Sequence, residues 1–136
     1  MKPLFGGVLI GGASRRMGQP KHLLRRGTRT FLEIALEAMR PLCQELVVLG
    51  SGEVPSLSEP VHRLGDVEGL RGPAAGILAA LRYEAHATWL IVACDMPRLH
   101  ADALRWLRDE HRREALAATM PKVSDHVIPT LSLIHI

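Results

Sequence analysis

One stretch, residues 9–21, constrains the fold of this chain more than any other, because the apolar residues 4–10 lead straight into it. It reads LIGGASRRMGQPK and contains three glycines and three basic residues: Gly11, Gly12, Gly18, Arg15, Arg16 and Lys21. Glycines accept backbone angles that are closed to other residues and let main-chain N–H groups approach a ligand. Arginine and lysine add positive charge suited to phosphate oxygens. The stretch therefore predicts a strand that opens into a phosphate-binding loop.

The distribution of charge favours a small polyanionic ligand. Seven lysines and arginines and no acidic residue precede Glu33, although the whole chain carries 17 basic and 14 acidic residues. Such asymmetry is also found in nucleic-acid-binding proteins. Here, however, the basic residues surround a glycine loop and have no interleaved aromatic residues on which bases would stack. We therefore expect a site for a nucleotide and no nucleic-acid partner.

Cysteine usage and hydropathy indicate the compartment. Cys43 and Cys94 stand apart, without the paired spacing of a zinc or redox motif, so we expect buried thiols in a reducing compartment. No stretch approaches the ~20 apolar residues that span a membrane, and the start of the chain lacks the apolar run of a signal peptide. These features predict a cytoplasmic protein with no membrane partner.

The rest of the chain alternates between apolar runs and amphipathic segments. Strands are predicted over residues 4–10, 46–49, 61–64, 89–94 and 116–120. Helices are predicted over residues 31–40, 74–81 and 99–114, with a polar turn over residues 25–29. The last helix is expected to bury Leu104, Leu107 and Trp106. This alternation indicates a single α/β domain over residues 1–136, with a doubly wound, mostly parallel sheet.

In such a sheet, ligands bind at the carboxyl ends of the strands. The glycine loop follows the first predicted strand, Asp66 follows the third and Asp95 closes the fourth. Topology therefore predicts that all three face one crevice. At the end of a buried strand, the Asp95 carboxylate suits Mg²⁺, which takes one or two carboxylates and leaves its other positions to water and phosphate. A helix cap is the alternative role for Asp95, and a plain loop carboxylate for Asp66.

The glycine loop resembles the G-G-x-S-x-R-M-G-x-x-K signature of nucleotidyltransferases related to molybdenum cofactor guanylyltransferase. Every specified position is matched, by Gly11, Gly12, Ser14, Arg16, Met17, Gly18 and Lys21. Residues 93–97 resemble the family motif whose aspartate holds the metal, and residues 66–77 resemble an aspartate followed by Gly-Pro-x-x-Gly-Ile. The resemblance covers residues 4–133. It implies a three-layer, Rossmann-like fold with helices on both faces of the sheet, as in nucleotide-diphospho-sugar transferases.

The resemblance also implies an activity and assigns residues to it. GMP would pass from GTP to the phosphate of molybdopterin with Mg²⁺ as cofactor, and pyrophosphate would be released. Catalysis is assigned to Arg16, Lys21 and Asp95, with Asp95 as the metal ligand. Nucleotide binding is assigned to Leu9, Ile10, Gly11, Gly12, Ser14, Lys21, Asp66, Gly72, Gly76 and Asp95. A solvated lysine at position 21 and a turn-forming serine at position 14 are the structural alternatives.

Two features depart from the family pattern. Gly50 and Ser51 stand where a family member can present an asparagine to the nucleotide, which bears on guanine selection. Residues 125–133 look like the family's sixth strand region, and the sequence stops at Ile136, before the acceptor side of the domain. We therefore expect a C-terminally truncated domain that retains the nucleotide half of the site and lacks turnover.

Three other functions are compatible with parts of the sequence. The first is a cytidylyltransferase of the same superfamily that acts on the molybdenum cofactor. Gly11 and Gly12, where that branch has Ala-Gly, favour the guanylyl branch, as do residues 72–77. The others are a non-catalytic nucleotide-binding protein and nucleic-acid binding through the basic N-terminal third. Proteins that deliver or accept the cofactor are further expected partners. Of the seven histidines, His22 is singled out because it follows Lys21.

Overall fold

A six-stranded sheet organises the fold. The computed structural model describes residues 2–11, 20–54, 56, 57, 59–114, 117–123, 125–127 and 131–134. In spatial order the strands are β5 (His62–Leu64), β4 (Glu45–Leu49), β1 (Leu4–Leu9), β6 (Thr88–Ala93), β10 (Leu131–Ile134) and β7 (Ala118–Thr119). The first four run parallel, whereas β10 pairs antiparallel with both β6 and β7. The predicted mostly parallel sheet is confirmed.

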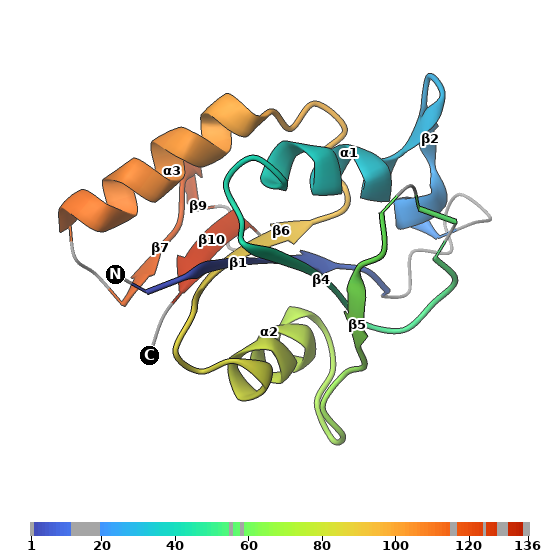
Figure 1. Ribbon diagram of the computed structural model, residues 1–136, viewed down its shortest axis with the longest axis horizontal. Helices are drawn as coiled ribbons and strands as arrows, with labels where there is room; N and C mark the ends of the chain where they lie inside the picture. The colour runs from blue at the N-terminus through green and yellow to red at the C-terminus, as the bar shows by residue number, and fades with distance from the viewer. Residues whose placement is uncertain are drawn as a thin grey trace.

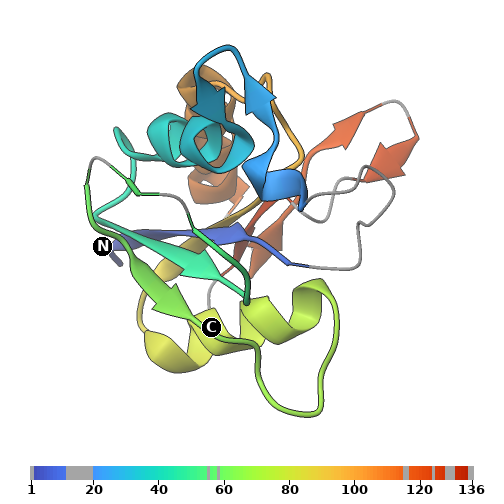
Figure 2. The same ribbon diagram turned by 90° about the vertical axis from the view of Figure 1, so that its right-hand side faces the viewer.

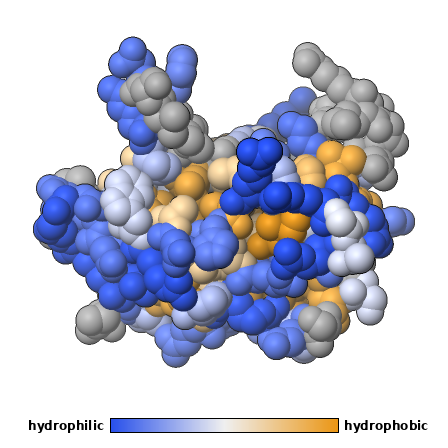
Figure 3. All heavy atoms as spheres, turned by 90° about the horizontal axis from the view of Figure 1, so that it is seen from above, coloured by the Kyte–Doolittle hydropathy of each residue, from blue (hydrophilic) through white to orange (hydrophobic). Residues whose placement is uncertain are grey.

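Helices cover both faces of this sheet, as Figure 1 shows. On one face lie α1 (Phe31–Met39) and α3 (Ala101–Glu114), and on the other lies α2 (Pro73–Tyr83). Each face has its own set of buried side chains, which includes Leu36 and Leu104 on the first face and Ala80 and Ile91 on the second. Polar side chains cover most of the outer surface of the α1 and α3 layer, and apolar side chains show between them (Figure 3). The predicted three-layer arrangement is therefore confirmed.

Two hairpins and one short turn complete the described structure. The turn η1 (Lys21–Leu23) precedes the hairpin of β2 (Arg25–Arg26) and β3 (Arg29–Thr30). Figure 2 shows this hairpin above the sheet, on the same side as α1. It contains the predicted polar turn. The second hairpin joins β8 (Lys122–Val123) and β9 (His126–Val127).

Local sequence signals explain where the first two helices begin. The main-chain N–H of Glu33 donates to Thr30 Oγ1, and the N–H of Thr30 donates to Glu33 Oε1, so the predicted capping box starts α1. α2 starts at Pro73, whose fixed φ and missing N–H suit the first turn of a helix. None of the described helices combines the length and the apolar character needed to cross a bilayer.

The prediction for Trp106 was wrong. Trp106 is 55% exposed, whereas Leu104, Leu107 and His111 are buried. Those three positions follow the helical period and face the sheet, so position 106 falls outside the buried stripe. The N-terminal end of this helix was also misplaced, because the N–H of Leu99 instead closes a turn onto Met96 O over 3.1 Å. The predicted strand over residues 116–120 is reduced to β7.

Candidate active site

The carboxyl ends of three neighbouring strands meet at one edge of the sheet. Leu9 of β1 lies in register with Leu49 of β4 on one side and with Ala93 of β6 on the other. The hydrogen-bonded pairing of β1 with β4 extends one residue beyond β1, since Ile10 N–H donates to Leu49 O over 2.8 Å. Figure 1 shows this edge on the right-hand side, where β5 also ends. Predicted nucleotide-binding residues Leu9 and Ile10 therefore lie at the edge where such sheets bind ligands.

The chain leaving β1 lies directly against the chain leaving β4. A Cβ atom on Gly50, whose φ is +113°, would lie only 2.3 Å from the carbonyl oxygen of Ile10. A Cβ atom on Gly11 would lie 3.2 Å from the carbonyl oxygen of Ser51. Both the backbone angle and the close approach therefore require glycine at position 50. Consequently Gly11, the first glycine of the predicted phosphate loop, borders the loop that follows β4.

Asp66 and Gly76 come together at the end of β1. Gly76 is buried in α2, and a Cβ atom there would lie 2.7 Å from Leu9 Cδ2 and 3.9 Å from Asp66 Oδ1. Gly72, at the N-cap of α2, is exposed and has a φ of +71°. The structure thus groups Asp66 with Leu9 and Gly76, and places Gly72 one turn of helix away.

Lys21 and Asp95 act electrostatically on the same atom. Burial, followed by the negative charge of Asp95, raises the pKa of the Cys94 thiol to about 11, and the positive charge of Lys21 opposes that rise. Cys94 is the residue directly after β6, so both charges lie near the carboxyl end of that strand. The side chains of Lys21 and Asp95 are exposed. The predicted cation and the predicted metal ligand therefore share one edge of the sheet.

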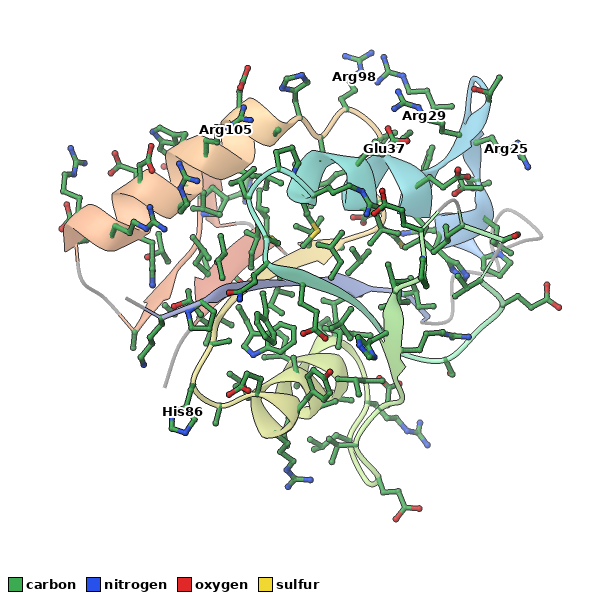
Figure 4. All side chains as sticks on the ribbon, in the orientation of Figure 1. Arg25, Arg29, Glu37, His86, Arg98 and Arg105 are labelled. Atoms are coloured by element: carbon green, nitrogen blue, oxygen red, sulfur yellow. The ribbon has the colours of Figure 1, made fainter. Side chains whose placement is uncertain are left out.

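Exposed arginines extend the positive charge from this edge over the α1 side of the molecule. Figure 4 shows Arg25, Arg29 and Arg98 on that side, with Arg29 next to Glu37, its partner in an ion pair. Arg26 lies between Arg25 and Arg29 in the sequence, and its side chain donates a hydrogen bond to Pro97 O in the loop after β6. Such exposed charges raise the local concentration of an anionic ligand more than they fix its position.

Several predicted site residues lie outside the described residues. They are Gly12, Ser14 and Arg16, together with the signature positions Met17 and Gly18. Their assignments to phosphate binding and catalysis stay predictions, as do the roles of the residues that the structure does describe.

Sequence reasoning missed two contacts that hold the loop after β4. His22 is 1% exposed, and its Nε2 lies 2.6 Å from Glu53 O. From β5, Arg63 Nη2 donates to Gly52 O over 2.7 Å. Only the position of His22 beside Lys21 drew attention in the sequence, and no local pattern pointed to Arg63.

A family model described as a MobA-like NTP transferase domain matches residues 6–135. The chain belongs to this MobA-like family. Among curated relatives, it is 31% identical over 128 residues to a probable molybdenum cofactor guanylyltransferase of Pelotomaculum thermopropionicum, covering 94% of this chain and 62% of the relative. It is 40% identical over 110 residues to a protein of the same description from Carboxydothermus hydrogenoformans, covering 80% and 55%. The chain thus spans somewhat more than half the length of these two relatives.

Solved structures agree with the MobA-like assignment. Molybdopterin-guanine dinucleotide biosynthesis protein A from Archaeoglobus fulgidus superposes with a TM-score of 0.76 at 28% identity, covering 96% of this chain and 67% of that one. A 2-C-methyl-D-erythritol 4-phosphate cytidylyltransferase from Thermus thermophilus superposes with a TM-score of 0.64 at 18% identity, covering 100% and 68%, and at that identity it supports the fold alone. The predicted nucleotide-diphospho-sugar transferase-like fold is confirmed.

The donor chemistry of this MobA-like edge suits a hard cation. Asp95 offers an exposed carboxylate at the end of β6. Within the described ranges, no group of three or more His, Cys, Asp or Glu side chains is placed to hold a metal ion. A single carboxylate does not fit a structural zinc site, whose ligands are supplied by the protein. It does fit Mg²⁺, which keeps water and substrate phosphates as its other ligands.

Proposed function

We propose that this chain is the nucleotide-binding part of a Mg²⁺-dependent guanylyltransferase. The full enzyme would transfer GMP from GTP to the phosphate of molybdopterin, form the guanine dinucleotide cofactor and release pyrophosphate. The observation that carries the proposal is that Gly11 after β1 and Asp95 after β6 leave the sheet at one edge, where Arg26, in the hairpin after Lys21, donates a hydrogen bond to Pro97 O in the loop that carries Asp95. The descriptions of the two curated relatives support the choice of reaction.

In the proposed reaction, the protein positions the reactants and stabilises charge. An oxygen of the acceptor phosphate attacks the α-phosphorus of GTP, the bond from that phosphorus to its bridging oxygen breaks, and pyrophosphate leaves. Main-chain N–H groups near Gly11 and Gly12 hold phosphate oxygens, and Lys21 and Arg16 offset the charge on the α-phosphate and on the leaving group. Asp95 would hold Mg²⁺, which supplies further neutralisation of the phosphate charge.

The same proposal assigns the other end of the nucleotide to the group around Gly76. Asp66, Leu9 and Gly76 lie together at the end of β1, and Gly72 leads into the same helix. A carboxylate there can accept hydrogen bonds from ribose hydroxyls or from the N–H groups of guanine. We also propose a cytoplasmic location, and cofactor-delivering or cofactor-accepting proteins as partners of the full enzyme.

Calorimetric titration with GTP and with CTP, each with and without Mg²⁺, tests this function. We expect GTP to bind more tightly than CTP and only weakly when Mg²⁺ is absent. Asp95→Asn should bind GTP weakly whether or not Mg²⁺ is present. Asp109→Asn, on the exposed surface of α3, serves as the matched control. Tighter binding of CTP would favour a cytidylyltransferase, and metal-independent binding by Asp95→Asn at wild-type affinity would favour a non-catalytic nucleotide-binding protein.

A separate assay tests turnover. Pyrophosphate release from GTP is measured with molybdopterin as acceptor. Because the chain spans 62% and 55% of the two curated relatives, we expect binding without turnover. A full rate of dinucleotide formation by these 136 residues would contradict that expectation.

A further inference from the structure

The turn η1 carries an exposed cation next to a buried histidine. Lys21 is exposed, and His22 is 1% exposed. The turn itself has two hydrogen bonds, from Leu23 N–H to Pro20 O over 3.1 Å and from Leu24 N–H to Lys21 O over 3.2 Å. A single turn of this length is not stable alone, so contacts with the rest of the protein must hold it.

The His22 ring supplies such a contact. Its Nε2 lies 2.6 Å from Glu53 O, 31 positions away in the sequence. A carbonyl oxygen can only accept, so Nε2 carries the proton and donates it. The ring also packs on the main chain of the same loop, since a Cβ atom on Gly52 would lie 3.3 Å from His22 Cε1. The buried ring therefore joins η1 to the loop after β4 by both a hydrogen bond and van der Waals contact.

The loop that receives this bond is itself held firmly. Arg63 Nη2 donates to Gly52 O over 2.7 Å from the β5 side. At its other end, Gly50 leaves no space for a side chain against Ile10 O, and Ser51 O lies against Gly11. The loop over residues 50–53 thus contacts Gly11, the first glycine of the predicted phosphate loop, and His22, the residue directly after Lys21.

We propose that His22 is a positioning residue: its hydrogen bond to Glu53 O holds the Lys21 turn against the loop over residues 50–53, and so fixes the Lys21 ammonium at the ligand edge. The identity of the ligand rests on the proposed function, but the mechanical role does not. Lys21 has a long, flexible side chain, and ordering it costs conformational entropy. A fixed main chain beneath it lowers the cost of bringing its charge to a phosphate.

Amide hydrogen exchange without any ligand tests the mechanical part. His22→Met fills the volume without a donor, and His22→Gln keeps a side-chain N–H. We expect roughly ten-fold faster exchange at Leu23 and Leu24 in His22→Met, which corresponds to the loss of one buried hydrogen bond. Exchange at Ile10 should not change, and His22→Gln should restore most of the protection.

His86→Met, at an exposed histidine, is the matched control. Unchanged exchange at both leucines would overturn the proposal. If His22→Met does not fold, His22→Asn, with its shorter side chain, takes its place.

Binding of GTP with Mg²⁺, and of inorganic tripolyphosphate, tests the action through Lys21. We expect His22→Met to weaken both by roughly ten-fold, and His22→Gln to bind nearly as the wild type does. In the Lys21→Ala background, His22→Met should cause no further loss, because the group that His22 positions is absent. If the losses of binding free energy in His22→Met and Lys21→Ala add in full in the double variant, the proposal is overturned. If the wild type binds neither ligand, the proposed function fails, while the exchange measurement still decides the role of His22.

Discussion

Arg26 Nη1 donates a hydrogen bond to Pro97 O over 2.9 Å, although the two residues are 71 positions apart in the sequence. The bond joins the hairpin after η1 to the loop after β6, which also carries Asp95. The hairpin that follows the segment resembling the family's phosphate motif therefore adjoins the segment that resembles the family's metal motif. Because the Arg26 side chain is exposed, the bond adds little stability, and its value lies in showing which segments meet.

The charges that surround Cys94 make the placement of Lys21 and Asp95 testable without a nucleotide. The thiolate is the reactive form of cysteine, so alkylation follows its pKa. Asp95→Asn removes a charge that raises this pKa and should speed alkylation of Cys94 several-fold at pH 8, whereas Lys21→Met should slow it. Iodoacetamide kinetics in a Cys43→Ala background measure both effects. Asp95 is the next residue in the chain and serves as the reference for a nearby charge, so an unchanged rate in Lys21→Met beside a changed rate in Asp95→Asn would mean that the Lys21 charge does not lie near Cys94.

Two thiols predict a loss of stability in alkali: Cys94 is buried, as expected from the sequence, whereas Cys43 is only half-buried. Burial raises the pKa of Cys43 from an ordinary 9.0 to about 12, and that of Cys94 to about 11. Above pH 9, unfolded thiols lose protons that folded thiols keep, so the unfolded state binds fewer protons and the free energy of unfolding falls as pH rises. The stability that these thiols lend is complete below pH 9 and is lost as pH rises through 11 to 12. The loss is on the order of 4 kcal/mol for Cys43 and of 3 kcal/mol for Cys94.

Urea denaturation at pH 8, 9.5 and 10.5 measures this alkaline loss. Cys43→Ala should flatten the fall in stability with pH, even though it lowers stability at pH 8 by removing a packed side chain. If stability falls with pH as steeply in both Cys43→Ala and Cys94→Ala as in the wild type, the alkaline transition belongs to other groups.

The sequence predicts most of the sheet and helices because their signals are local. The capping box at Thr30 and Glu33, Pro73 at a helix start and the apolar run that forms β6 each act within a few residues. Trp106 shows the limit of such reasoning, since the phase of α3 rather than apolar character decides its exposure.

Contacts across long stretches of sequence were not predictable in this way. The bond from His22 to Glu53 O and the bond from Arg63 to Gly52 O join side chains to main-chain oxygens, which carry no residue-specific signal. Topology alone did predict that the ends of β1 and β6 adjoin, because parallel strands in one sheet end at the same edge.

Gly50 is expected to tolerate no side chain. Gly50→Ala places a Cβ atom 2.3 Å from Ile10 O at a φ of +113°, and a main-chain oxygen cannot move aside as a side chain does. We expect a loss of roughly 3 kcal/mol or more in the free energy of unfolding, measured by urea denaturation. Gly65→Ala is the matched control, because a Cβ atom there has no heavy atom within 4 Å. Similar small losses in the two variants would show that the loop after β4 relaxes easily.

Gly76 should separate stability from binding. Gly76→Ala gains about 1 kcal/mol of helix propensity in α2, and its Cβ atom meets Leu9 Cδ2, the end of a side chain that can rotate away. The two effects oppose each other, so we expect the free energy of unfolding to change by less than about 1 kcal/mol. The displaced Leu9 and the added methyl group next to Asp66 should nevertheless weaken GTP binding by roughly ten-fold, since a packed site tolerates little added volume. Calorimetry beside urea denaturation separates the two quantities. Unchanged GTP affinity in a stable Gly76→Ala protein would remove the group around Gly76 from the nucleotide site.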